Sequence, residues 1–448
     1  MEADKLKDLR EKSIPRLLLG YSLTTFAALL LNSIYTLTDA IFIGRGIGAE
    51  ALGGITAVLP FTIFQSAISL AIGGGAAILV SQLLGKGEKK RAGETFLLAA
   101  VTFWFTAIII TILGLIFIDP LIDLLGAADG LKGYAKQYLT ILLIGNVFST
   151  GFSSVMRAEG KMFASTLQWV IPISVNIILD AVFIFGLKMG VAGAAWATVA
   201  CQITSVITSF TFFAKFSSLE FRGAKLKNAK LKDIFSAGLP SLVQNGSIAV
   251  GMALLNNVFK AVSGGEMQVI YGLISKIFMF FIVPFTAVTQ ALQPIAGYNY
   301  GANRTEKIKT AIKYTVLFSL IASLVALLIC EAAPKPMLKI LTDDSGLIES
   351  GSYALRWISA AFPLMFLPSA VGVLLQSTGK KLAASLLFAE NYIFIPPLAF
   401  LLVKLSGVNA VWISFPVAGA LASVIAVIVL IIWLKSSNSS QRIVPLSK

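Results

Sequence analysis

The sequence predicts an all-α polytopic membrane protein whose twelve transmembrane helices form two six-helix lobes. Three observations lead to this fold class. First, 57% of the 448 residues are hydrophobic and only 13% are charged, whereas soluble domains carry about 25% charged residues. Second, twelve apolar runs reach the length of about 20 residues that a helix needs to cross the hydrocarbon core. Third, the second half of the chain repeats the first.

The first apolar run is expected to remain as a helix, because it is too long for a signal-peptide core and lacks a small-residue cleavage site. The runs follow one another through short, polar connections. In chain order they cover residues 16–43, 53–83, 95–118, 134–156, 162–186, 190–214, 235–259, 268–296, 311–333, 353–376, 382–403 and 409–434.

The internal repeat appears at two closely similar shifts along the chain. The segment that begins at Tyr134 aligns without gaps with the segment that begins at Tyr353. A slightly shorter shift aligns Trp196 with Trp412. Because six helices, an even number, intervene, the two halves run in the same direction. We therefore expect a pseudo-twofold axis along the membrane normal to relate them.

A basic loop separates the two repeats and helps to set the orientation. We expect an N-terminal lobe over 1–214, a cytoplasmic basic linker over 215–234, and a C-terminal lobe with a cytoplasmic tail over 235–448. With the N-terminus inside, the inner connections and the tail hold 25 Lys and Arg residues, and the outer connections hold about 7. This asymmetry predicts a multi-pass protein of the inner or plasma membrane with both termini cytoplasmic.

Composition also excludes several classes of function. The formal charge of +14 lies in short loops between apolar runs, so we expect membrane lipids and no nucleic acid as partners. The chain has no histidine, which removes the commonest general base and metal ligand. Cys201 and Cys330 fall within apolar runs, where a thiol packs as a small hydrophobe. The sequence thus indicates no enzyme, cofactor or metal centre, and any proton chemistry falls to carboxylates.

Asp180 is the principal functional candidate, because it lies inside the apolar run at 162–186. An Asp at the centre of a membrane helix costs on the order of 2.5–3.5 kcal/mol, so intramembrane acids are functional candidates by default. Asn176 lies four residues before Asp180, and Pro172 lies four before that. All three should share one helical face that looks into protein.

The depths of several polar residues suggest that they meet Asp180. Asp39 lies about 8 Å from the outer end of the first helix. Asp180 and Thr198 each lie about 12 Å below the outer surface, and Tyr138 lies slightly above them. We therefore expect these side chains in one slab of the outer half of the N-terminal lobe. Asn32 and Tyr35 share a helical face with Asp39, at spacings i, i+3 and i+7.

Several motifs together resemble one transporter family. They are TLTDAIFIGRGIGAEALGG at 36–54, RAEGK at 157–161, QPIAGYNYGANR at 293–304 and LQSTGK at 375–380. They are similar to the multidrug and toxic compound extrusion (MATE) family over nearly the whole chain. The resemblance implies a twelve-helix exporter with two lobes, which rocks between inward-open and outward-open states in exchange for H⁺ or Na⁺. It looks closest to the DinF-like branch, in which two aspartates of the N-terminal lobe carry the coupling.

The resemblance also implies roles for individual residues. The proton or cation site would comprise Asp39, Asn176, Asp180 and Thr198, and Na⁺ would bind at the same four if it were the coupling ion. The substrate site would comprise Asn32, Tyr35, Asp39, Tyr138 and Asp180.

Each of these residues also has a structural alternative. Asp39 could be an interfacial acid beside Arg45. Tyr35 and Tyr138 could belong to the outer aromatic belt. Asn176 and Thr198 could hold helices together without binding a ligand.

The C-terminal lobe offers one intramembrane charge of each sign. These are Lys276, in the run at 268–296, and Glu390, in the run at 382–403. We expect a buried charge pair, since two costly groups are tolerated most easily when they neutralise each other. Substrate contact is the alternative role.

The function expected from the sequence is proton-coupled antiport of amphipathic, cationic organic compounds by a monomer. Two alternatives stay within membrane transport: a Na⁺-coupled multidrug exporter and a flippase for lipid-linked precursors. A flippase would need basic residues in its cavity to hold a pyrophosphate, and only Lys276 and Arg356 are available. A membrane-embedded enzyme or a receptor would be a further class, and the sequence shows no catalytic motif that favours it.

Overall fold

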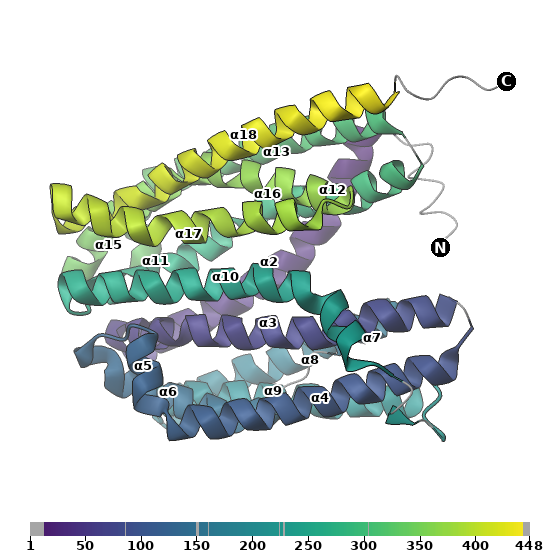
Figure 1. Cartoon of the computed structure of the whole chain (residues 1–448). Helices are drawn as coiled ribbons and strands as arrows, with labels where there is room; N and C mark the ends of the chain where they lie inside the picture. The colour runs from purple at the N-terminus through teal and green to yellow at the C-terminus, as the bar shows by residue number, and fades with distance from the viewer. Residues whose placement is uncertain are drawn as a thin grey trace. The chain divides into compact units, whose positions relative to one another are not determined.

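The computed structural model describes residues 13–85, 87–148, 152–159, 161–223, 225–226, 229–302 and 304–441. Within these ranges the chain is helical and contains no strand (Figure 1). The first half comprises α2 (Ile14–Gly46), α3 (Ala49–Gly85), α4 (Lys89–Ile116), α5 (Ile118–Leu124), η1 (Asp129–Leu131), α6 (Lys132–Gly145), η2 (Asn146–Phe148), α7 (Ser153–Ala158), α8 (Met162–Asp180), η3 (Ala181–Gly186) and α9 (Val191–Lys215). The second half comprises α10 (Leu231–Ser263), α11 (Glu266–Phe281), α12 (Val283–Gly301), α13 (Thr305–Ala332), α14 (Pro334–Lys339), α15 (Ser345–Ser359), α16 (Phe362–Ser377), α17 (Lys381–Ser406), η5 (Val408–Ile413) and α18 (Ser414–Gln441).

The spanning helices match the apolar runs of the sequence. Among the described residues, eight helices are long and apolar enough to cross a membrane, and eleven when each of three bent pairs counts as one span. Helix α2 adds a further stretch, residues 17–38, without a charged residue. The predicted all-α polytopic fold class is confirmed.

The bends between paired helices occur close to prolines. Helix α10 bends by 54° at Pro240, α11 and α12 meet at 49°, and α15 and α16 meet at 43°. Pro284 is the second residue of α12, and Pro363 is the second residue of α16. Because proline removes one helical hydrogen bond and clashes with the preceding turn, it favours a bend at these positions.

The helix boundaries reproduce the internal repeat. Helices α4 and α13 have the same length, and one shift along the chain superposes both their first and their last residues. The same holds for α2 and α10 at a nearly equal shift. The shift that aligns Tyr134 with Tyr353 also aligns the first residues of α8 and α17. Each half therefore builds the same succession of helices from aligned segments.

The chain divides into two compact units, residues 38–272 and residues 1–37 with 273–448. These units differ from the lobes expected at 1–214 and 235–448, because α10 belongs to the unit of residues 38–272 and most of α2 belongs to the other unit. In the unit of residues 38–272, a core of Ile72, Phe96, Phe152 and Phe213 packs between α3, α4, α7 and α9. The other unit has its own core, which includes Leu18, Leu292, Leu374 and Trp433.

Glycines allow α10 to lie directly along α3 (Figure 1). A Cβ atom on Gly238 would lie 1.8 Å from the Ala71 carbonyl oxygen, and one on Gly75 would lie 2.2 Å from the Ile234 carbonyl oxygen. The two backbones are thus in direct contact, as small residues permit at membrane helix crossings.

Candidate functional site

Pro172, Asn176 and Asp180 lie on one buried face of α8, as their spacing predicts. Asn176 and Asp180 are both 0% exposed, whereas Ile178 between them is 63% exposed. Neither carboxylate oxygen of Asp180 accepts a hydrogen bond from a donor among the described residues, and neither polar atom of the Asn176 amide has a partner there. Burying polar atoms in this way is costly, so this face has unused capacity to bind a proton or a ligand.

Asp39 of α2 lies beside Asp180. The two carboxyl groups interact electrostatically and lie within side-chain hydrogen-bonding range. An ionised carboxylate only accepts hydrogen bonds, and a protonated one also donates. A hydrogen bond between the two groups therefore requires one proton, and a single shared proton would satisfy both.

Close packing between α2 and η3 positions Asp39. The Phe42 and Phe185 rings meet edge to face, with centroids 5.4 Å apart. A Cβ atom on Gly46 would lie 2.4 Å from Cγ2 of Ile184. The absence of a side chain at Gly46 thus lets the last turns of α2 approach the segment that follows Asp180.

Tyr138 of α6 and Thr198 of α9 complete the cluster. The Tyr138 hydroxyl lies near the Thr198 side chain and interacts electrostatically with both aspartates. The Thr198 hydroxyl donates to the Ala194 carbonyl oxygen at 3.1 Å, so its oxygen can still accept. The structure therefore brings together Asp39, Asp180, Tyr138 and Thr198, with Asn176 one helical turn from Asp180.

Three features near the cluster were not predicted. A π-helix, η3, begins directly after Asp180; insertions of this kind are frequent at functional sites. Cys201 lies within electrostatic range of Asp180. Gln202 has a buried side-chain oxygen without a hydrogen-bond partner among the described residues. Its position four residues after Thr198 was an available signal, because residues at i and i+4 share a helical face.

Two residues of the predicted substrate site are not placed at the cluster. Tyr35 is half-buried in α2 and belongs to the compact unit of residues 1–37 and 273–448. Asn32 lies in α2, and its side chain falls outside the described residues. Their roles stay predictions.

The predicted charge pair of Lys276 and Glu390 is not formed in this structure. Lys276 is buried in α11 and Glu390 is half-buried in α17. One carboxylate oxygen of Glu390 is buried without a hydrogen-bond partner among the described residues, and no ion pair joins the two side chains. Burying this carboxylate oxygen without a hydrogen bond is costly.

The cluster contains oxygen ligands but no dense group of acids. Among the described residues, no three or more His, Cys, Asp or Glu side chains are arranged to hold a metal ion. The two carboxylates, the Asn176 amide and the Thr198 hydroxyl supply the oxygen donors that hard cations prefer. This arrangement can hold a proton or a small cation.

Comparison with known proteins identifies the family. The family model described as MatE matches residues 25–182 and 240–401. The chain belongs to the MatE family. The matched segments fall in the two repeats, and they include Asp39, Asn176 and Asp180 in the first.

Relatives of this MatE protein share its whole length. It is 24% identical over 438 residues to multidrug export protein MepA of Staphylococcus haemolyticus (strain JCSC1435). The aligned region covers 96% of each chain. Its fold is similar to an inward-facing multidrug resistance MATE family transporter of the MOP superfamily, with a TM-score of 0.85, 21% identity, and coverage of 95% of this chain and 99% of that one. A ligand complex of the MATE multidrug transporter DinF-BH gives a TM-score of 0.75 and 29% identity, over 94% of this chain and 97% of that one. These similarities confirm the two-lobe, multi-pass MATE fold.

Proposed function

We propose that the chain is a secondary active antiporter of the DinF-like branch that exports amphipathic, cationic organic compounds in exchange for protons. Asp39 and Asp180 are the coupling groups. The names of its relatives, which include a multidrug export protein and multidrug transporters, support the export of small organic molecules. Transport proceeds by alternating access of one site to the two sides of the membrane.

The contact between the Asp39 and Asp180 carboxyl groups carries this proposal. Two negative charges in contact repel each other strongly where water is excluded, so the pair holds one proton in its stable state. Loss of that proton leaves a net negative charge, which attracts a cationic compound. Return of the proton removes the attraction and favours release of the compound.

The second repeat lacks this pair, which supports a single coupling site. When α2 and α10 are aligned on their first residues, Asn256 falls at the position of Asp39. The same alignment of α8 with α17 places Ala399 at the position of Asp180. Asn256 donates to the Ala57 carbonyl oxygen at 3.3 Å, a contact that holds α10 to α3.

Sodium coupling is a second candidate, and Asn176 favours it. The amide oxygen of Asn176 is buried without a hydrogen-bond partner among the described residues, one turn from Asp180. A cation between this oxygen, the carboxylates and the Thr198 hydroxyl would satisfy all of them.

A flippase for lipid-linked precursors is supported less well. The side chain of Arg356 is 57% exposed, and its Nε lies 3.5 Å from Oε2 of Glu331. A carboxylate therefore already compensates the Arg356 guanidinium. Of the two basic residues considered for binding a pyrophosphate, Lys276 remains.

We further propose the arrangement in the cell. Both termini face the cytoplasm, residues 1–214 and 235–448 form the lobes that move, and the protein acts as a monomer. Membrane lipids and the transported compounds are its partners. The basic residues of the inner connections support this orientation.

Separately imposed ion gradients test the proposed coupling. The purified protein is reconstituted in vesicles loaded with a fluorescent lipophilic cation, and efflux is followed under a proton gradient alone and under a sodium gradient alone. Proton coupling predicts efflux above the protein-free background only with the proton gradient. Efflux with the sodium gradient alone would support sodium coupling in place of proton coupling. An absence of efflux above background with either gradient would reject both.

A further inference from the structure

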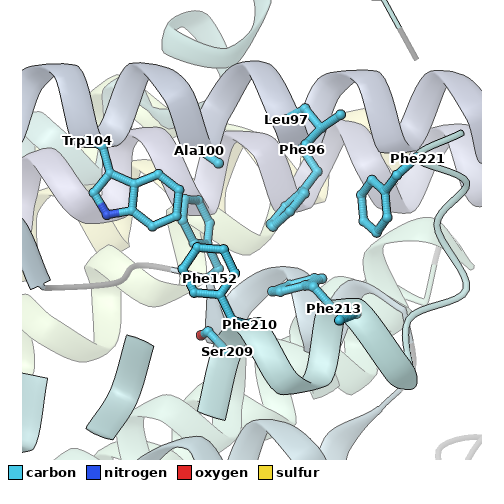
Figure 2. A pocket seen from close by; sticks show the side chains of 10 residues that line it. Phe96, Leu97, Ala100, Trp104, Phe152, Ser209, Phe210, Phe213 and Phe221 are labelled. Atoms are coloured by element: carbon cyan, nitrogen blue, oxygen red, sulfur yellow. The ribbon is translucent and has the colours of Figure 1, made fainter. Parts of the chain in front are cut away.

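An aromatic pocket lies in the compact unit of residues 38–272, away from the aspartates. It is a cavity of about 230 Å³ between α4, α9 and the segment that follows α9 (Figure 2). Phe96 and Trp104 of α4 both line it, about 12 Å apart along the helix. That length approaches one leaflet, half of the hydrocarbon core of about 30 Å. The pocket therefore has the depth of one acyl chain that runs parallel to the helices.

The walls of the pocket are preformed by stacked rings. The Trp104 and Phe210 rings are parallel, with an interplanar angle of 4° and centroids 5.5 Å apart. Phe96 packs against Phe213 at 4.1 Å and against Phe152 at 5.1 Å. Ser209, a polar residue in the lining of the pocket, accepts a hydrogen bond of 2.9 Å from the Gln168 amide. The lining thus favours a purely apolar occupant.

The segment after α9 closes one end of the pocket. Glu159 accepts hydrogen bonds from the Ser217 hydroxyl at 2.9 Å and from the Ser218 backbone N–H at 2.6 Å. The Lys225 backbone N–H donates to Glu94 at 3.0 Å. These bonds hold Phe221 at the rim, where it faces Phe96 with ring centroids 5.8 Å apart.

Three exposed cations belong to the segments that form this end. Lys215 directly follows the lining residue Ala214, and Arg222 directly follows Phe221. The Lys90 Nζ lies 3.9 Å from where a Cβ atom of Gly223 would be. None of the three forms an ion pair with a carboxylate among the described residues. The acids nearby are Glu220, which is exposed, Glu88, which pairs with Arg91, and the two glutamates that hold the segment.

We propose that this pocket binds the acyl chain of an anionic membrane lipid, whose phosphate is held by Lys90, Lys215 and Arg222. Phe210 lines the pocket and is 56% exposed, and its neighbour Ile207 is 59% exposed, so the pocket opens toward the lipid-facing surface of α9. Lys and Arg side chains near the membrane surface attract an anionic headgroup. The pocket has no carboxylate in its lining, so it does not favour the cationic compounds proposed above. The inference depends on membrane insertion and not on the coupling ion.

Trp104 provides a local probe of occupancy. The full-length protein is placed in phosphatidylcholine nanodiscs that contain a fixed fraction of acyl-brominated phosphatidylglycerol or acyl-brominated phosphatidylcholine. The Trp104 signal is the fluorescence difference between the unaltered protein and Trp104→Phe. Brominated phosphatidylglycerol is expected to quench that signal at least twofold more than brominated phosphatidylcholine. An equal effect of the two lipids would overturn the proposal.

A rim variant and a matched control test the role of the cations. Lys90→Ser, Lys215→Ser and Arg222→Ser together should bring the ratio of quenching by the two lipids to about one. Three changes in other connections, Lys335→Ser, Lys380→Ser and Lys404→Ser, should leave the ratio unchanged. A ratio that survives the rim variant, or falls equally in the control, contradicts a headgroup site at these residues.

A second variant tests the pocket itself. Ala100 is buried in the lining, and Ala100→Phe should fill the cavity and remove the selective quenching of Trp104. Undiminished selectivity in a folded Ala100→Phe protein would show that the lipid binds elsewhere. If this variant does not fold, the rim variant decides, because its three side chains are exposed.

Discussion

The carboxyl groups of Asp39 and Asp180 lie within hydrogen-bonding range of each other, although the two residues are far apart in the chain. The contact joins the last turns of α2 to the end of α8, next to the π-helix. Asp180 is fully buried, and Asp39 is half-buried. The pair therefore lies in the interior of the compact unit of residues 38–272 and not on its surface.

Asp180→Asn should abolish gradient-driven export while the protein stays folded. The amide has a similar shape but cannot exchange a proton, and neutral Asn is less costly to bury than an ionised carboxylate. Efflux from vesicles should fall at least tenfold, to the protein-free background. Asp233→Asn, which changes an exposed aspartate of α10, is the matched control and should export normally. Full efflux by a well-folded Asp180→Asn protein would show that this acid is not the coupling group.

Gly46→Ala should destabilise the protein by about 1–3 kcal/mol, the usual cost of overpacking. The added methyl group would lie 2.4 Å from Ile184, so α2 and η3 must separate. Thermal unfolding in detergent measures the loss. Gly186→Ala is the control, because a Cβ atom there meets nothing within 4 Å. Equal stability of the two variants would mean that this contact does not hold the helices together.

Much of the fold follows from the sequence because membrane thickness sets the length of each apolar run. Helices α4 and α13 share their boundaries at one shift along the chain, and the alignment of Trp196 with Trp412 has the same shift. Burial is less predictable: Trp412 is 1% exposed and Trp196 is 41% exposed. The same apolar residue types face lipid on one side of a membrane helix and protein on the other. The sequence therefore did not predict the aromatic pocket.

The candidate site was predictable to a similar extent. The i, i+4 spacing of Asn176 and Asp180 identified their shared face, because helical geometry is regular there. The π-helix after Asp180 breaks that regularity, and no residue type in the segment specifies it. The expected pairing of Lys276 with Glu390 is not formed because charge balance alone does not determine which helices present their side chains to each other.

Lys276 and Glu390 should show little energetic coupling. Since no ion pair joins them, the effects of Lys276→Gln and Glu390→Gln on the free energy of unfolding should add within about 0.5 kcal/mol. Thermal or denaturant unfolding of the two single variants and the double variant gives the coupling energy. A value clearly above that limit would indicate that the two charges meet in the folded protein.

Asp123 should stabilise the protein in a pH-dependent manner. Its carboxylate lies 2.8 Å from the Lys132 ammonium and 3.5 Å from that of Lys260, and the hydrogen bond from Lys132 lowers the pKa of Asp123 below its ordinary value. A lowered pKa in the folded state gives stability that is present above the unfolded value of about 3.9 and is lost as the pH falls through the folded value. Asp123→Asn should thus lower the unfolding temperature at pH 7, and this loss should shrink as the pH falls below the ordinary value of the carboxyl group. A loss that does not change with pH would exclude a charge effect.

The final prediction concerns competition between protons and the transported cation. If Asp39 and Asp180 share one proton and a cationic compound binds only after its loss, protonation and binding must weaken each other to the same degree. The affinity for the compound should then rise about tenfold per pH unit while the pair titrates, and binding should release about one proton for each molecule bound. Calorimetry in buffers of different ionisation enthalpy measures the proton release, and fluorescence titration at several pH values measures the affinity. Both effects should disappear in Asp180→Asn and persist in Asp233→Asn. A constant affinity without proton release would separate the aspartate pair from substrate binding and direct attention to sodium.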